Sequence, residues 1–216
     1  MKAKLIAEFS GTAFLVMIVL GSGMMAQNLF QGHAGLALLA NSLATGAGLF
    51  VLIQCLGHIS GAHLNPVVSI VEVLWRRMCP RMASLYVGAQ MTGAYLGVIL
   101  AHIMFDQKMF QVSVIERSGI HLWISELIAT FGLICVVGLS GKKHVEFAPV
   151  SVALYIMSAY WFTSSTSFAN PAVTFARLFT NTFGGMSPEY YLPFILAQLT
   201  GGVLAWFVLS KFQKDI

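Results

Sequence analysis

Two asparagine–proline boxes are the residues of this chain whose types and spacing could do chemistry. Asn65-Pro66-Val67 and Asn170-Pro171-Ala172 lie half a chain apart, and each opens a short stretch of helical character, at 66–74 and 171–180. Asparagine is a preferred N-cap and proline fits the first helical position, so each box should begin a helix. About ten residues cannot cross a bilayer, which needs roughly 20. The boxes therefore predict two half-helices whose N-terminal ends face one shared pathway.

The chemistry of such a pair is hydrogen bonding in a pore. An asparagine that caps its own half-helix holds its side chain fixed and leaves NH2 donors for the lumen. Two such donors make a passing water or hydroxyl accept twice, which interrupts a proton-conducting chain of hydrogen bonds, and the facing helix ends repel cations. The alternative is that Asn65 and Asn170 are structural caps only. Their symmetric placement favours the pore.

The elements that must position the boxes are membrane spans. Charged residues make up 9% of the 216 residues, against roughly 25% in soluble proteins, while hydrophobic residues make up 57% and the mean hydropathy is +0.80. Apolar runs of spanning length lie at about 3–25, 34–57, 82–105, 121–140, 147–164 and 190–212. We expect an all-α membrane protein that forms one integral membrane domain over residues 1–216.

The basic residues indicate how the spans are oriented. With the N-terminus inside, the inner loops collect nine Lys or Arg residues and the outer loops three, so the positive-inside rule places both termini in the cytoplasm. The inner set is Lys2, Lys4, Arg76, Arg77, Arg81, Lys142, Lys143, Lys211 and Lys214, and the outer set is Lys108, Arg117 and Arg177. Topology therefore accounts for the net charge of +4, and the chain shows no basic patch for nucleic acid.

Catalytic motifs are missing from the sequence. Cys55, Cys79 and Cys135 have neither CxxC nor metal-ligand spacing, and no nucleophile motif or phosphate loop occurs. His63, two residues before Asn65, would need further ligands to hold a metal. We expect no enzyme activity, no cofactor and no metal site.

The chain contains an internal repeat, over about 1–105 and 120–212. The first span of each half carries a matching acid, Glu8 or Glu126, and the last spans match as AQMTG and AQLTG, which contain Gly93 and Gly201. Three spans per half invert the second half relative to the first and place the site at the midplane between them. The two glycines suit close helix crossings.

Glu8 and Glu126 allow two interpretations. Acids inside spans are costly and often functional, as in proton-coupled transport. Alternatively, each carboxylate accepts hydrogen bonds from the irregular loop before an Asn-Pro box, the loop that includes His63, because such backbone needs partners at membrane depth.

The paired boxes, the paired glutamates and the paired AQxTG sequences resemble the aquaporin/glyceroporin (major intrinsic protein) family over essentially the whole chain. The resemblance implies a right-handed bundle of six helices with two re-entrant half-helices, supporting glutamates, and a homotetramer with one pore per subunit. The short ends resemble bacterial-type members, and a location in the cell membrane follows.

The selectivity filter departs from the family pattern. The position of the usual arginine, three residues after the second asparagine, is Val173, and an arginine follows one turn later at Arg177, a possible charge at the mouth. Family spacing puts the other filter positions at Thr45, Ser158 and Ser167. This quartet of small side chains predicts a wide filter, unless a nearby aromatic residue narrows it or the register of the fifth span differs.

The resulting hypothesis is a passive channel for water and small uncharged solutes such as polyols, urea or metalloid hydroxides like arsenous acid. Two alternatives stay open at this point. One is a proton-coupled secondary transporter that uses Glu8 or Glu126. The other is a leaky channel that also passes ions or ammonia, because Val173 carries no charge.

Overall fold

The long helices confirm the membrane fold expected from the sequence. The computed structural model describes residues 1–143 and 145–212, and no strand occurs in this part of the chain. Five of its helices are long and apolar enough to cross a membrane. They are α1 (Lys2–Leu29), α2 (Ala34–Ser60), α4 (Pro80–Met104), α5 (Ile120–Lys143) and α8 (Tyr191–Phe212).

The expected fifth span is shorter than the others. It is α6 (Ala148–Phe162), which has 15 residues and is therefore about 22 Å long at 1.5 Å per residue. A 3-10 turn, η1 (Val145–Phe147), precedes it, and extended backbone follows at Thr163. A further 3-10 turn, η3 (Pro188–Tyr190), leads into α8. Six apolar helices thus surround the two half-helices.

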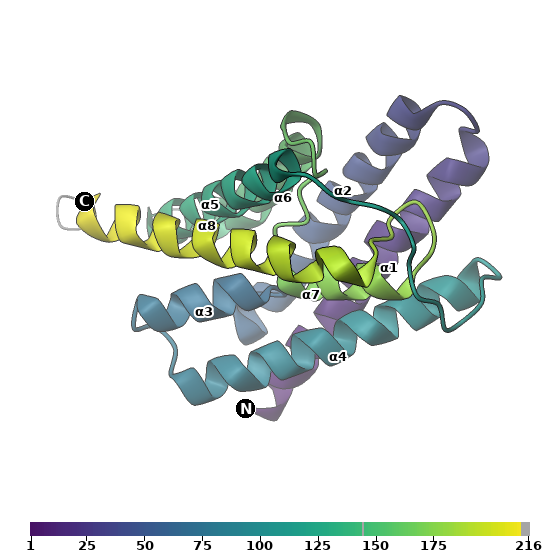
Figure 1. Ribbon diagram of the computed structural model, residues 1–216. Coiled ribbons are helices and arrows are strands. Elements are labelled where there is room, and N and C mark those ends of the chain that lie inside the picture. Colours follow the sequence, from purple (N-terminus) through teal and green to yellow (C-terminus); the bar gives the residue numbers. More distant parts are fainter. Residues whose placement is uncertain (144, 213–216) are drawn as a thin grey trace.

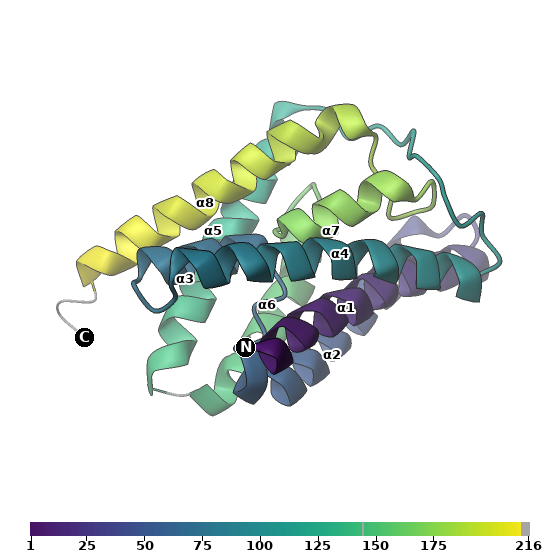
Figure 2. The same cartoon turned by 90° about the horizontal axis from the view of Figure 1, so that it is seen from below.

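The two half-helices are α3 (Pro66–Leu74) and α7 (Pro171–Ala176). Each begins with its proline, directly after an asparagine in extended conformation. The second prediction, a helix over 171–180, differs in its last turn, since α7 gives way to a 3-10 turn, η2 (Arg177–Phe179). In Figures 1 and 2 α3 and α7 begin near each other in the middle of the bundle and run apart.

Glycines let the outer helices of each half approach closely. A Cβ added at Gly93 in α4 would overlap the backbone of Phe9 in α1, and one at Gly201 in α8 would overlap the backbone of Leu127 in α5. Small residues at such crossings allow backbone-to-backbone packing, which stabilises helix pairs in lipid. These pairs form the frame around the half-helices.

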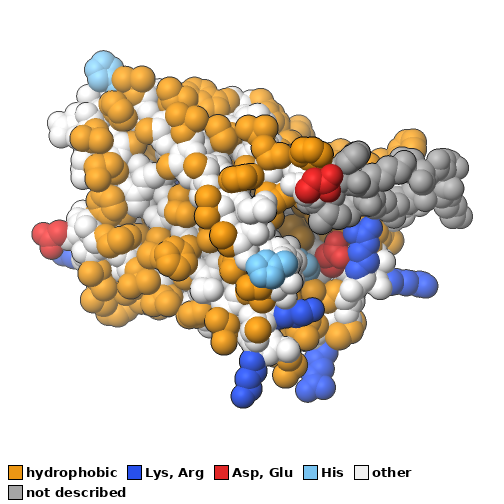
Figure 3. Space-filling view, turned by 180° about the vertical axis from the view of Figure 1, so that it is seen from behind, with side chains coloured by type: hydrophobic (Ala, Val, Ile, Leu, Met, Phe, Trp, Pro, Cys, Tyr) orange, Lys and Arg blue, Asp and Glu red, His pale blue; other side chains and the backbone are white. Residues whose placement is uncertain are grey.

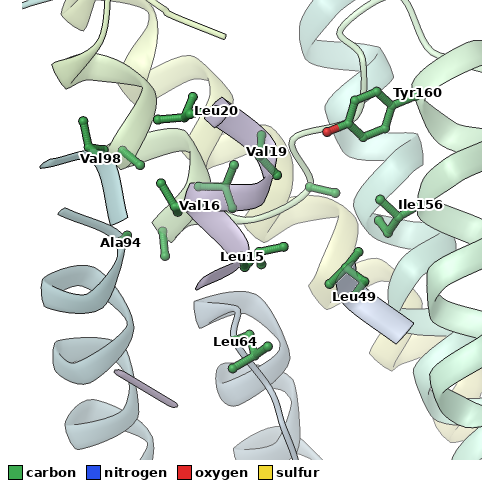
Figure 4. Close-up of a cluster of buried hydrophobic side chains, with 14 of the residues drawn as sticks. Leu15, Val16, Val19, Leu20, Leu49, Leu64, Ala94, Val98, Ile156 and Tyr160 are labelled. Atoms are coloured by element: carbon green, nitrogen blue, oxygen red, sulfur yellow. The ribbon is translucent and has the colours of Figure 1, made fainter. Parts of the chain in front are cut away.

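Apolar side chains cover the surface and also fill the interior. Figure 3 shows hydrophobic side chains over most of one face, with lysine and arginine gathered toward one end. Inside, Leu15 and Val19 of α1, Leu49 of α2, and Ile156 and Tyr160 of α6 belong to one cluster (Figure 4). This cluster supplies one side of the cavity described below.

Candidate functional site

The two asparagines cap their half-helices and also join the two halves. The Asn65 Oδ1 accepts from the Val67 N–H at 2.9 Å, and the Asn170 Oδ1 accepts from the Ala172 N–H at 2.9 Å. Each Nδ2 then donates across the site: Asn65 to the Ala169 carbonyl at 2.8 Å and Asn170 to the Leu64 carbonyl at 2.7 Å. Because an amide nitrogen carries two protons, one proton per asparagine is left for the lumen.

Two buried carboxylates hold the loops that lead into the boxes. The Glu8 Oε1 accepts from the Ser60 hydroxyl at 2.7 Å and the His63 N–H at 3.0 Å. Its Oε2 accepts from the Leu64 N–H and from Gln90 Nε2, both at 2.8 Å. Four donors therefore saturate a side chain that is fully buried.

Glu126 repeats this arrangement in the second half. It accepts from the Ser165 hydroxyl at 2.6 Å, from the N–H groups of Phe168 and Ala169 at 2.8 Å, and from Gln198 Nε2 at 2.6 Å. Its side chain is also fully buried. The structure therefore places both glutamates as loop supports, and neither reaches water, as a proton carrier would have to.

The supported loops contain unusual backbone. Ala62 and Leu64 in the first loop, and Thr166, Ser167 and Ala169 in the second, have positive φ angles between 46° and 63°. Left-handed conformations cost energy in residues other than glycine and persist only where surrounding contacts impose them. The carboxylates supply those contacts, because irregular backbone at membrane depth needs partners.

His63 belongs to the first loop, and its ring lies at the cavity wall. Its Nδ1 lies 3.0 Å from the Ser69 hydroxyl of α3, and its ring meets Tyr86 edge-on with centroids 5.1 Å apart. Gln90 Nε2 donates to the same Ser69 hydroxyl at 3.1 Å. The histidine is thereby fixed between the loop and the half-helix that follows it.

A cavity of about 690 Å³ passes between the asparagine caps. At one end it is lined by Glu72 and Arg77, which form an ion pair at 3.3 Å. Its middle section is lined by Asn65 and Asn170, and its other end by the predicted filter region with Arg177. The largely apolar wall between these polar points offers a solute few hydrogen bonds, which suits rapid passage.

Three of the four predicted filter residues line this cavity. Thr45, Ser167 and Val173 lie on its wall and are buried. The Thr45 hydroxyl lies 3.2 Å from the Tyr160 hydroxyl. The aromatic side chain of Tyr160 therefore lies beside the small side chain of Thr45 on the cavity wall.

The predicted position of Ser158 is wrong. Its side chain is exposed on the outer side of α6 and donates to the Tyr155 carbonyl at 2.7 Å. Ile156 and Tyr160, four residues apart on one helical face, line the cavity instead. Counting back from Asn170 presupposes the path of the connecting loop, and with the loop found here Ser158 does not line the cavity.

Arg177 contributes a charge that Val173 does not have. Its guanidinium lines the cavity and its side chain is only 3% exposed. Its Nη1 donates to the Gly184 carbonyl at 2.8 Å, its Cζ lies 3.8 Å from the centre of the Phe168 ring, and it also interacts with Tyr160. The long side chain thus brings its charge to the cavity from one turn beyond the expected position.

The sequence allowed for a nearby aromatic residue at the filter, with Tyr160, Trp161, Phe162 and Phe168 as candidates, and of these Tyr160 and Phe168 line the cavity. Their spacing alone did not reveal their direction. Phe168 lies in the strained loop, and the orientation of Tyr160 follows from the α6 register.

Comparisons with known proteins agree with this geometry. Residues 1–163 match the family model described as major intrinsic protein. The chain is 50% identical over 200 residues to aquaglyceroporin AqpS of Rhizobium meliloti, covering 93% of this chain and 85% of that protein. It is 30% identical over 221 residues to aquaporin NIP2-3 of Zea mays, covering 98% and 70%.

A solved structure supports the same fold. The X-ray structure of the aquaglyceroporin from Plasmodium falciparum aligns with a TM-score of 0.67 at 22% sequence identity, covering 100% of this chain and 96% of that one. Together with the paired asparagine caps and their carboxylate supports, these matches show that the chain belongs to the major intrinsic protein family.

Proposed function

We propose that this protein conducts water and small uncharged hydroxylated solutes passively through the cavity between its asparagine caps. Members of the family to which this chain belongs form passive channels for water and small solutes and are not enzymes. The solutes that we add are polyols, urea and neutral metalloid hydroxides such as arsenous acid. The observation that carries the proposal is the cavity of about 690 Å³ that runs past both caps to Arg177.

The cavity favours neutral solutes over ions. A cation that moves past Asn65 and Asn170 meets amide N–H donors, and beyond them it meets the buried guanidinium of Arg177. Removing an ion from water without compensating ligands is costly. Water and small hydroxylated solutes can instead accept hydrogen bonds from these donors and donate to the hydroxyl groups of Thr45 and Tyr160.

The outer constriction that we propose differs from the quartet expected from the sequence. Thr45, Ser167 and Val173 are small, whereas Tyr160 adds a ring and a hydroxyl, and Arg177 adds a charge. Val173 occupies the place where the family pattern has its arginine, so the charge comes from farther along the chain. We propose that this arrangement admits solutes larger than water and retains a barrier to cations.

We also propose the membrane placement of the channel. The inner set of basic residues supports cytoplasmic termini and a location in the cell membrane. Of that set, Lys214 lies outside the described residues, as do the side chains of Lys142 and Lys143. A homotetramer, with one pore formed by repeats at about 1–105 and 120–212 of each subunit, follows from the family resemblance.

Stopped-flow light scattering on proteoliposomes tests the proposal. A hyperosmotic glycerol pulse should produce rapid shrinkage from water efflux and then re-swelling faster than in protein-free vesicles. Arsenous acid would then be tested in the same way. Fast shrinkage without accelerated re-swelling would refute the passage of polyols and leave a water channel, and shrinkage no faster than in empty vesicles would refute the channel itself.

A further inference from the structure

Arg117 lies in the segment that joins the two halves and contacts Phe168, a residue of the cavity wall. Its Nε donates to the Gly185 carbonyl at 2.9 Å and its Nη2 to the Phe183 carbonyl at 3.4 Å. Its Cζ also lies 5.0 Å from the centre of the Phe168 ring. One side chain from residues 105–119 thus contacts both the strained loop before Asn170 and the loop after η2.

Arg177 contacts the same two loops. It donates to the Gly184 carbonyl, between the two carbonyls that Arg117 binds, and its Cζ lies 3.8 Å from the centre of the same Phe168 ring. The two guanidinium groups therefore bind three consecutive carbonyls between them, and both contact the same aromatic ring. A planar guanidinium suits such fork-like donation and stacking, which a lysine cannot reproduce.

The buried Glu126 carboxylate attracts both cations but forms a salt bridge with neither. Among the described residues neither of them forms a salt bridge, and the buried Arg177 charge lies close enough to repel Arg117. Burial, and then this repulsion, lower the pKa of Arg117 to about 10, so the side chain remains charged at pH 7. The carbonyls, the ring and the attraction of Glu126 together offset the repulsion. The carbonyls and the ring also restrict where each guanidinium can lie.

Backbone bonds fix the segment that carries Arg117. The Ser113 N–H donates to the Leu178 carbonyl at 2.9 Å, the Met186 N–H to the Arg177 carbonyl at 3.0 Å, and the Ser187 N–H to the Ile115 carbonyl at 2.8 Å. Arg117 is thus anchored to the same strip of chain whose carbonyls it binds. It can transmit that anchoring to Arg177 through Phe168 and the carbonyls of Phe183, Gly184 and Gly185.

We propose that Arg117 is a positioning residue for the outer constriction, which holds Phe168 and the Arg177 guanidinium in place and thereby limits the size of the solutes that pass. The proposal rests on the proposed function, because it presumes that solutes cross this constriction. Without Arg117 the 183–185 loop loses two of its three guanidinium bonds, and Phe168 loses one of its two cations. Arg177 can then swing away from the wall, which widens the constriction.

The test compares solute permeabilities of Arg117→Ala and the unaltered channel in proteoliposomes. Lys108→Ala is the control, since it removes one positive charge from an exposed side chain of the same connecting segment. We expect the ratio of erythritol to glycerol permeability to rise about tenfold in Arg117→Ala, the change produced by lowering the barrier to the larger solute by about 1.4 kcal/mol. Lys108→Ala should leave the ratio unchanged, and Arg117→Lys should raise it less than Arg117→Ala does.

A double-mutant cycle separates positioning from a general loss of folding. If Arg117 acts through Arg177, adding Arg117→Ala to Arg177→Ala changes the ratio little further. If it serves only stability, all permeabilities fall in proportion and the two effects add, which would overturn the inference. An unchanged ratio in Arg117→Ala, with normal glycerol flux in the unaltered channel, would also overturn it, whereas absent glycerol flux in that channel would refute the proposed function instead.

Discussion

Replacing Glu8 by glutamine should destabilise the fold, although it removes only a charge and changes the shape of the side chain very little. The carboxylate of Glu8 accepts two hydrogen bonds at each oxygen, from Ser60 and His63 on one side and from Leu64 and Gln90 on the other. Whichever way the glutamine amide turns, its NH2 group faces two donors.

The expected cost follows from counting these donors. A buried donor left without a partner costs about 1–3 kcal/mol. If the Ser60 hydroxyl turns to accept from the new NH2, one donor is orphaned, and if the amide is reversed, two are. The substitution should therefore lower the free energy of unfolding by about 1 to 6 kcal/mol.

The assay is unfolding of the purified protein in mixed detergent micelles, together with water permeability of the reconstituted variant per folded protein. Glu72→Gln is the matched control, because Glu72 lies at the cavity mouth and pairs with a half-exposed Arg77. We expect Glu72→Gln to change stability by less than about 1 kcal/mol. A Glu8→Gln protein as stable as the unaltered one would refute the assignment of Glu8 as a loop support.

Three further substitutions test other parts of the account. Gly93→Ala should destabilise the α1–α4 pair by about 1–3 kcal/mol, because the added Cβ would overlap the backbone of Phe9. Gly88→Ala has open space around it and should not lower the midpoint of thermal denaturation. Asn65→Asp retains the cap acceptor but replaces the lumenal donor by a negative charge, so cation conductance should appear in planar bilayers, and no conductance would contradict the barrier assigned to the caps. Tyr160→Ala should speed glycerol re-swelling by removing the ring beside Thr45, whereas Ser158→Ala, on the outer face of α6, should leave it unchanged; equal rates in the two variants would contradict the observed register.

Features set by local chemistry could be predicted from the sequence. Asparagine is a preferred N-cap and proline fits the first helical position, so α3 and α7 were expected at their observed starts. The role of Glu8 could also be anticipated, since irregular backbone in a membrane requires an acceptor for its N–H groups. The membrane spans and the half-helices could be predicted from the hydropathy and length of each segment.

Features set by how distant segments meet could not be predicted. The carbonyl partners of Asn65 and Asn170 belong to the opposite half, so no local pattern identifies them. The direction of Tyr160 depends on the path of the loop before Asn170. The reach of Arg177 depends on the carbonyl of Gly184, which the sequence does not place beside it.

Thiol modification of an engineered cysteine on the cavity wall tests most directly whether solutes pass through this cavity. In a background in which the native Cys55, Cys79 and Cys135 are replaced by alanine, Val173→Cys would place a thiol on the wall and Ser158→Cys would place one on the outer face of α6. A bulky mercurial reagent should then block water flux in the Val173→Cys channel, with reversal by a reducing thiol, and leave the Ser158→Cys channel active. Loss of flux in Ser158→Cys together with full flux in a labelled Val173→Cys channel would contradict the account.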